Sequence, residues 1–302
     1  HKYSHFLLIV FFMIFLLESV VEIIGNGFII VVLGREWMRC WTLTPGDMIL
    51  ANLDISRFFL QWTAIISDFC SYFFSPSKGV LLGMMWNLPN VTTFWFTTLL
   101  AVFYCVKLSS FNHSIFFWLK WRISRFVPWL LLWSLVLSIL ISILSFVKGY
   151  HVLQFPVIGN YSEKTILNAN IRAFQIHFFL PLQLFILLIP FFVFLVSIIL
   201  LTSSLCQHLG NMEHHSADPQ DPRMQVHIIT LKSLFFFLIL FTSYLLPLII
   251  TTTAPISVCS SWFWIREVVT YAGISIHPAF LILNTSKLRR ALKKMLHDPE
   301  SA

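Results

Sequence analysis

The chain has 302 residues, of which 58% are hydrophobic and only 11% are charged. About a quarter of the residues in soluble domains are charged, so this composition excludes an ordinary soluble globular protein and indicates a membrane protein. The net charge of +7 does not indicate a nucleic-acid-binding protein, because the basic residues lie in the gaps between apolar stretches and not in one patch interleaved with aromatic residues.

Seven apolar stretches follow one another along the chain, and each is long enough to cross a bilayer as a helix. The predicted fold is therefore an all-α membrane protein, with a single domain over 1–302 that forms a seven-transmembrane helix bundle. The first stretch is too long for a cleavable signal peptide and is predicted to be the first crossing. The predicted helices lie at about 6–33, 46–73, 80–106, 127–147, 176–205, 228–252 and 263–283.

The basic residues predict how the bundle is oriented. Thirteen of them fall in one alternate set of gaps: Arg35, Arg39, Lys107, Lys120, Arg122, Arg125, Arg223, Lys232, Lys287, Arg289, Arg290, Lys293 and Lys294. Six fall in the other set: Lys2, Lys78, Lys148, Lys164, Arg172 and Arg266. Because Lys and Arg are concentrated in cytosolic loops, the N-terminus is predicted to be extracellular and the C-terminus cytosolic.

A polar stripe marks the first helix, where Glu18, Glu22 and Asn26 follow one another at four-residue steps. Residues at this spacing share one helix face. A polar face is unfavourable in lipid, so this one is predicted to face the bundle interior. Two interpretations are open. The stripe either lines a wall wetted by water or ligand, or forms internal hydrogen bonds that fix the first helix to its neighbours.

The second helix carries Arg57 deep in apolar sequence. A charge at that depth costs at least ~2.5 kcal/mol, so it requires a partner. Asp54, one turn back on the same helix, and Asn26 are the candidates. An ion pair that stabilises the fold is favoured over a ligand contact. His277 in the last helix is assigned to the same group of structural polar residues.

The stretch 86–125 contains most of the third helix and the basic segment after it, and it indicates two different surfaces. Trp86 and Asn90 lie four residues apart, on one helical face, and they predict a pocket for a small molecule. The bases Lys107 and Lys120 follow the apolar part and predict a cytosolic surface. Pro89 lies between Trp86 and Asn90, and a kink there would reorient Trp86. Alternatively, Trp86 anchors the helix at the membrane interface and Asn90 bonds between helices.

Three smaller features complete the predictions. Asn160 is the one glycosylation sequon in a predicted extracellular loop. Cys70 and Cys259 lie near predicted extracellular ends, where they form either a disulfide or two free thiols; the cysteine spacings predict no metal site. After Asn284, one face of residues 286–297 is apolar and the other basic, which predicts a short amphipathic C-terminal helix on the inner leaflet. Its apolar face comprises Leu288, Ala291, Leu292, Met295 and Leu296.

Several motifs resemble one known family. FYCVKLSSF at 103–111 and HSIFFWLKWRIS at 113–124 closely resemble the third-helix and second-loop signature of the bitter taste receptors (taste receptor type 2), which are G-protein-coupled receptors. GNGFI at 25–29, SRFFLQW at 56–62 and QDPRMQVHIITLKSL at 220–234 extend the resemblance. Asp54 departs from the small residue expected at its position, and Pro89 also departs from the family.

The resemblance implies a non-enzymatic, glycosylated receptor of the plasma membrane that couples a pocket for bitter small molecules to a heterotrimeric, gustducin-like G protein. The ligand-binding residues are predicted to be Trp86, Asn87, Asn90, Tyr244, Glu267 and Tyr271. The residues facing the G protein are predicted to be Tyr104, Lys107, Lys120, Arg122, His227 and Lys232.

The sequence also leads to expectations about other partners and alternative functions. Membrane lipids are expected to contact the chain, with a sterol as one candidate, whereas no cofactor or nucleic acid is expected and the oligomeric state is not predicted. The alternative functions are a small-solute transporter and a pheromone-type chemosensory receptor. A transporter is disfavoured because internal repeats are not visible and the number of predicted helices is odd.

Overall fold

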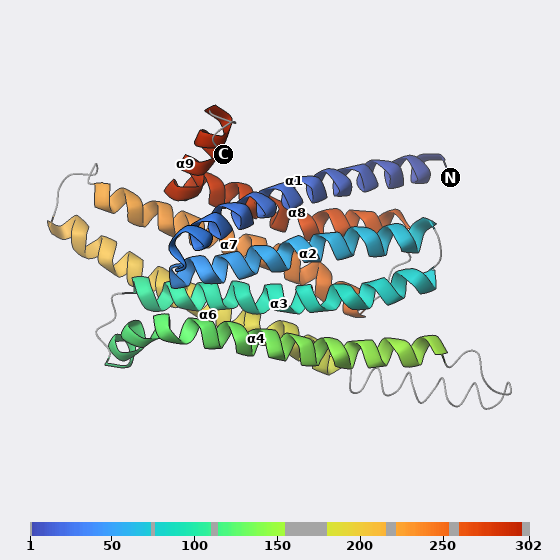
Figure 1. Cartoon of the computed structure of the whole chain (residues 1–302), viewed down its shortest axis with the longest axis horizontal. Helices are drawn as coiled ribbons and strands as arrows, with labels where there is room; N and C mark the ends of the chain where they lie inside the picture. The colour runs from blue at the N-terminus through green and yellow to red at the C-terminus, as the bar shows by residue number, and fades with distance from the viewer. Residues whose placement is uncertain are drawn as a thin grey trace.

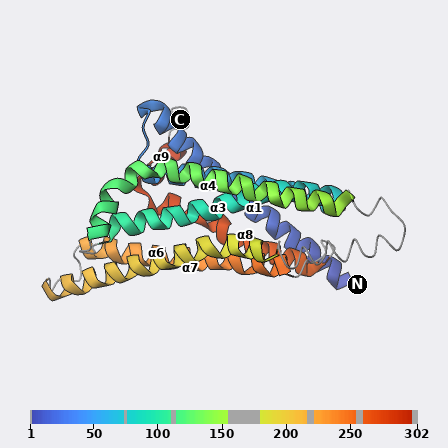
Figure 2. The same cartoon turned by 90° about the horizontal axis from the view of Figure 1, so that it is seen from below.

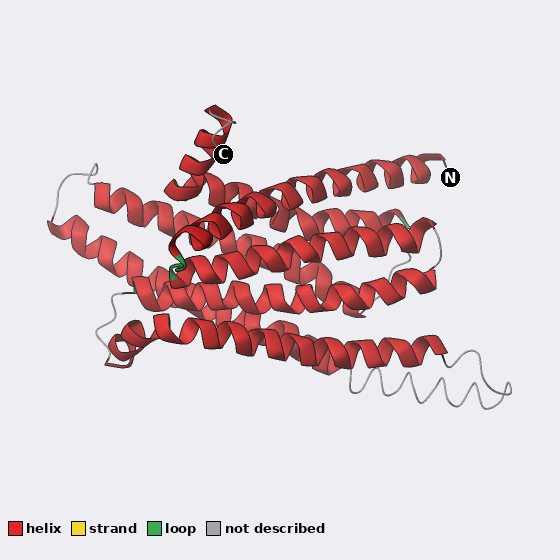
Figure 3. Ribbon diagram, viewed as in Figure 1, coloured by secondary structure: helices red, strands yellow, loops and turns green. Residues whose placement is uncertain are grey.

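The structure is a computed structural model and describes residues 2–73, 76–109, 114–154, 180–215, 222–253 and 260–297. These ranges form eight helices and contain no strand (Figure 3). The helices are α1 (Lys2–Cys40), α2 (Pro45–Phe73), α3 (Pro76–Leu108), α4 (Ser114–Gln154), α6 (Leu180–His215), α7 (Pro222–Thr253), α8 (Ser261–Asn284) and α9 (Ser286–His297).

Seven long helices lie side by side and alternate in direction along the chain, while the short α9 projects away from them (Figures 1 and 2). The axis of α9 makes an angle of 88° with that of α8. The N-terminus lies at one end of the bundle and α9 at the other; these are called the N-terminal end and the α9 end below. The predicted all-α bundle of seven long helices with a short C-terminal helix is confirmed.

Several helices extend beyond the apolar stretches that predicted them. α1 ends at Cys40 and not near 33, α4 begins at Ser114 and not near 127, and α6 continues to His215. Hydropathy marks only the part of a helix that suits lipid. The hydrogen bonds of a helix are internal to its backbone, so the helix continues through charged and polar residues outside that part.

Hydropathy differs among the described helices. Four segments are long and apolar enough to cross a membrane by themselves, at 6–40, 85–108, 116–144 and 184–207. α2 is not among them, because its buried face carries Asp54, Arg57 and Gln61. These residues lower the hydropathy of α2 without exposing polar groups to lipid, since all three side chains point into the bundle and are buried.

α3 is the central helix and packs against α2, α4 and α6. Its buried residue Phe94 belongs to the main core together with Phe194, Tyr271 and Trp264. By contrast, α4 presents large apolar side chains such as Trp129 and Trp133 at its surface. A soluble protein rarely exposes apolar patches of this kind, which suit the lipid-facing side of a membrane protein.

Two glycines allow α8 to lie very close to its neighbours. A Cβ atom on Gly25 of α1 would lie 2.7 Å from Cβ of Pro278, and one on Gly273 would lie 2.8 Å from Oγ of Ser243 on α7. Both distances are too short for a real side chain. α8 therefore contacts α1 on one side and α7 on the other at positions where only glycine fits.

One hydrogen bond links α3 to α6 in the middle of the bundle. The hydroxyl of Thr98 donates to the backbone carbonyl of Pro190, 2.9 Å away. Proline has no backbone N–H, so the regular ladder of α6 is already interrupted at this residue. Thr98 thus links α3 to α6 at a residue where the backbone ladder of α6 lacks a donor.

An ionic cluster holds the start of α9 against α1 and α2. The ammonium of Lys287 pairs with Glu36 and lies 3.1 Å from Oδ2 of Asp47. Burial disfavours the charge on Lys287, but its hydrogen bonds to Glu36 and Asp47 outweigh this effect and raise the pKa of Lys287. Leu288, the next residue, is buried. The first turn of α9 is therefore held by an ion pair on one face and by apolar packing on the other.

Candidate ligand-binding site

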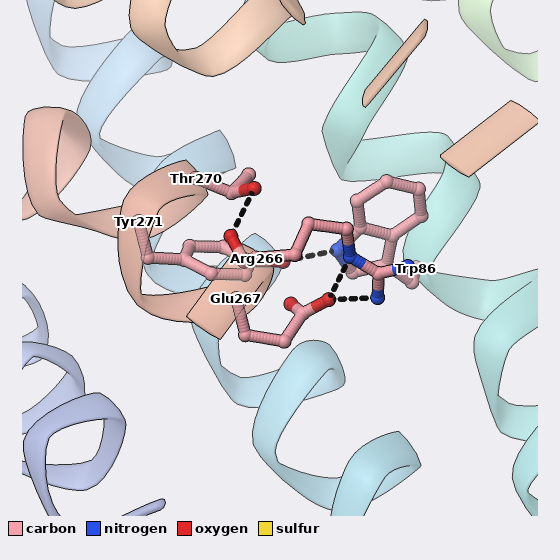
Figure 4. A network of polar contacts seen from close by, with 5 residues as sticks. All are labelled: Trp86, Arg266, Glu267, Thr270 and Tyr271. Carbon is pink, nitrogen blue, oxygen red and sulfur yellow. Dashed lines mark hydrogen bonds and ion pairs between the residues drawn. The ribbon is translucent and has the colours of Figure 1, made fainter. Parts of the chain in front are cut away.

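Trp86 reaches across the bundle to α8. Its indole Nε1 donates a hydrogen bond of 2.8 Å to the hydroxyl of Tyr271 (Figure 4). α3 runs without a break through Pro89, and the indole is half-buried and packs against the main core. This placement favours a side chain facing the bundle over an interfacial anchor pointing to lipid.

Asn90, one turn further along α3, contacts α7. Its Oδ1 accepts a hydrogen bond of 2.5 Å from the hydroxyl of Tyr244. The rings of Tyr244 and Tyr271 meet edge to face with centroids 6.4 Å apart. Four of the six predicted ligand-binding residues, Trp86, Asn90, Tyr244 and Tyr271, are therefore brought together from three helices.

Glu267, the fifth predicted residue, pairs with its neighbour Arg266 (Figure 4). Nε of Arg266 donates to Oε1 of Glu267 over 3.0 Å, a second guanidinium nitrogen contacts the same oxygen, and the guanidinium lies 4.5 Å from the ring centroid of Phe263. The carboxylate of Glu267, which is predicted to bind a ligand, is thus already paired with Arg266. A cationic ligand would have to compete with Arg266 for it.

Two further polar side chains border this group. Asn87, the sixth predicted residue, is half-buried, and its Nδ2 has no hydrogen-bond partner among the described residues. Asp68 on α2 interacts electrostatically with both Glu267 and Arg266. Sequence reasoning missed Asp68 because nothing in the pattern of α2 distinguishes it; only the proximity of α8 does.

The side chains of this site bond to one another, so a ligand must exchange some of these bonds for its own. A hollow of about 540 Å³ lies away from this site, between α2, α3 and α4, and its lining includes Asn52, Pro89 and Pro128. Exposed Ile55 and Phe59 on its rim place this hollow on the lipid-facing surface of the bundle.

Asp54 interacts electrostatically with Arg57, as predicted, but the hydrogen-bond contact of Arg57 is with a residue that the sequence did not indicate. A guanidinium nitrogen of Arg57 contacts Nδ1 of His277 on α8, whereas neither carboxylate oxygen of Asp54 has a hydrogen-bond partner within the described ranges. Asn26, the other candidate, donates instead to Glu22 over 3.5 Å. Asp54 is one turn from Arg57 in sequence, but the imidazole of His277 lies directly opposite the guanidinium.

The polar stripe of α1 faces inward as predicted. Glu22 and Asn26 are fully buried. Oε2 of Glu22 accepts a long hydrogen bond of 3.5 Å from Ser275 on α8. These contacts favour the second interpretation of the stripe, internal hydrogen bonding between α1 and α8.

At the α9 end, basic side chains of α3 and α4 bond to backbone carbonyls of the facing helix. Lys107 donates to the carbonyl of Lys120 over 3.2 Å, and Lys120 donates to that of Ser109 over 3.4 Å. The guanidinium of Arg122 lies 5.0 Å from the ring centroid of Trp118. Tyr104 and Lys232 are exposed, whereas His227 lies in α7 with a side chain outside the description.

Two predictions fall wholly or partly outside the described residues. Asn160 lies in the undescribed range 155–179. Cys259 lies in 254–259, whereas its proposed partner Cys70 is a free thiol. The alternative of free thiols therefore holds for Cys70.

Comparisons with known proteins identify the family. Residues 4–300 match the family model described as Taste receptor protein (TAS2R). Taste receptor type 2 member 134 of Rattus norvegicus is 44% identical over 96% of this chain and 87% of its own length. Member 143 of the same species is 41% identical over 94% and 97%, and member 16 of Gorilla gorilla gorilla is 40% identical over 95% and 97%. This chain belongs to the taste receptor type 2 family, a family of multi-pass G-protein-coupled receptors and not of enzymes.

Proposed function

We propose that the chain is a bitter taste receptor of the plasma membrane, with an extracellular N-terminus and a cytosolic α9. On this proposal a small molecule binds near the N-terminal end of the bundle and shifts the equilibrium towards an arrangement that a heterotrimeric G protein recognises. The basic residues near the α9 end support this orientation, since such residues concentrate in the cytosol.

The observation that carries the proposal is the pair of contacts Trp86–Tyr271 and Asn90–Tyr244. They bring an indole, an amide and two phenols from α3, α7 and α8 into one place. Flat aromatic surfaces and a few orienting polar groups are what a small-molecule site requires. A ligand that replaces either bond changes how α3 is held to α7 or α8, and this couples binding to helix position.

Calcium imaging of cells that express the full chain with a promiscuous G-protein α subunit tests the proposal, using a panel of bitter compounds. For an agonist found in this way, Trp86→Ala and Asn90→Ala should each raise the EC50 at least about tenfold, which corresponds to ~1.4 kcal/mol. Surface expression should remain normal. No response to any compound would contradict the receptor function.

Matched controls separate the site from general damage to the fold. Trp133→Ala removes an exposed tryptophan of α4, and Asn52→Ala removes an amide that donates to the carbonyl of Met48 within α2. Both should leave the EC50 unchanged. Equal effects of the site variants and these controls would contradict the proposed pocket.

The cytosolic side has its own test. Double replacement of Lys107 and Lys120 by Met should lower the maximal calcium response more than it changes the EC50, because these residues lie on the face proposed to contact the G protein. An antibody to an N-terminal tag should bind intact cells, and one to a C-terminal tag only permeabilised cells. Deglycosylation should shift the wild type on a gel and leave Asn160→Gln unmoved.

A further inference from the structure

A small cavity lies in the centre of the bundle, between α2, α3, α7 and α8. It offers about 20 Å³ to water, and roughly 10–15 Å³ of such space is enough for one molecule. Its lining includes Arg57 from α2, Thr97 from α3, Phe237, Phe241 and Tyr244 from α7, and His277 from α8.

Three residues that line this cavity each have one polar atom without a hydrogen-bond partner among the described residues. These atoms are Nε of Arg57, Oγ1 of Thr97 and Nε2 of His277. The exposed fractions of these residues are 5%, 4% and 2%. Leaving one buried polar atom unpaired costs ~1–3 kcal/mol, so three around one cavity require a common partner.

We propose that one water molecule fills this cavity and bridges Arg57, Thr97 and His277. Buried waters make about three hydrogen bonds on average, which equals the number of unpaired atoms. Arginine can only donate, so Nδ1 of His277 accepts from Arg57, and the imidazole proton resides on Nε2. The water then accepts from Nε of Arg57 and Nε2 of His277 and donates to the hydroxyl of Thr97.

The charges around the cavity favour water over an ion. A cation would be repelled by the guanidinium of Arg57 in the cavity wall. An anion would have to compete for Arg57 with Asp54 and Glu22, both of which interact electrostatically with its guanidinium. Desolvating any ion is costly, whereas a water molecule supplies both the two acceptor positions and the donor that the three atoms need.

The bound water links the centre of the bundle to the proposed ligand site. Tyr244 lines the cavity and also donates to Asn90, so both sites share a wall formed by α7. A displacement of α7 would open the cavity and release the water. This consequence depends on the proposed function, but the presence of the water does not.

A structure of the full chain in lipid nanodiscs, determined at a resolution that shows ordered water, tests the proposal. It should show one peak in the cavity within about 2.7–3.2 Å of all three atoms. An empty cavity in the wild type would overturn the proposal. Replacing chloride by bromide and sodium by rubidium should leave the peak height unchanged; a higher peak in either salt would show an ion and equally overturn it.

Variants of Thr97 test how the water is held. Thr97→Ser keeps the hydroxyl and should retain the peak, whereas Thr97→Met fills the cavity and should abolish it. The matched control is Thr92→Val, which removes a hydroxyl of α3 that bonds within its own helix, to the carbonyl of Leu88; its peak should remain. Loss of the peak in Thr92→Val, or its persistence in Thr97→Met, would contradict the assignment.

Discussion

The polar contacts near the N-terminal end of the bundle differ from those at its centre. Around Trp86, which is half-buried, each contact is complete between the side chains of two residues. Around Arg57, the side chains are buried, and several of their atoms have no partner in the described part of the chain. A ligand can replace the hydrogen bonds near Trp86 one at a time. The buried side chains around Arg57, by contrast, depend on every charge and hydrogen bond that they have.

The largest effect should follow from removing the central charge. Arg57→Met leaves the buried carboxylates of Asp54 and Glu22 without a counter-charge, and breaking a buried pair costs ~3–5 kcal/mol. Flow cytometry of surface-labelled cells should show at least a tenfold loss of surface receptor. Arg122→Met, which removes an exposed guanidinium, should leave surface expression normal.

A second change sharpens the role of Asp54. If the carboxylate is tolerated only because Arg57 is near, Asp54→Asn combined with Arg57→Met should recover part of the lost surface expression. If the double variant recovers surface expression, Asp54 is the carboxylate that Arg57 neutralises. If it does not recover, Glu22 is that carboxylate.

Close packing should give the next largest effect. Gly25→Ala forces α1 away from Pro278, and overpacking typically costs ~1–3 kcal/mol. The melting temperature of the purified receptor should fall by several degrees. Gly34→Ala is the matched control, because its added methyl group meets no described residue within 4 Å and alanine is the better helix former. If Gly25→Ala melted at the same temperature as the wild type, α1 and α8 would separate easily enough to admit the methyl group.

The two tyrosines should differ in a smaller but measurable way. Tyr244→Phe leaves Oδ1 of Asn90 buried and unpaired, at a cost of ~1–3 kcal/mol. Tyr271→Phe frees the indole of Trp86, which is half-buried and can reach other partners. The melting temperature should therefore fall more for Tyr244→Phe than for Tyr271→Phe; the reverse order would contradict the comparison between these contacts.

The ionic cluster at α9 should contribute least. Lys287 is partly exposed, and such pairs contribute about 0–1 kcal/mol. Because its pKa is raised above the ordinary 10.5, this contribution is complete below about pH 10.5 and is lost as the pH rises through the higher folded value. Lys287→Met should lower the melting temperature slightly at pH 7, and the difference should shrink at strongly alkaline pH. Lys293→Met should show neither effect.

The sequence predicts more about single helices than about their neighbours. Hydropathy located seven helices because lipid constrains each one separately, and helical spacing placed Trp86 and Asn90 on an inward face. The partner of Arg57 lies 220 residues away, and no periodicity indicates which helix lies opposite a given face. The sequence therefore indicates Asp54 and Asn26 as candidates for Arg57, and it does not indicate His277. Arg266 as the partner of Glu267 was missed for a different reason, since adjacent residues on a helix do not normally face each other.

The hydrogen bond from Thr98 to Pro190 also provides a point about which α6 can tilt. It anchors the helix at one point, so the following residues, to the end of the apolar segment at Gln207, act as a lever. Those 17 residues span about 26 Å at 1.5 Å each, so a rotation of ~10° about Pro190 moves the far tip by roughly 4–5 Å. A threonine hydroxyl and a missing backbone N–H thereby define a pivot about which a small tilt of α6 becomes a displacement as wide as a side chain at Gln207.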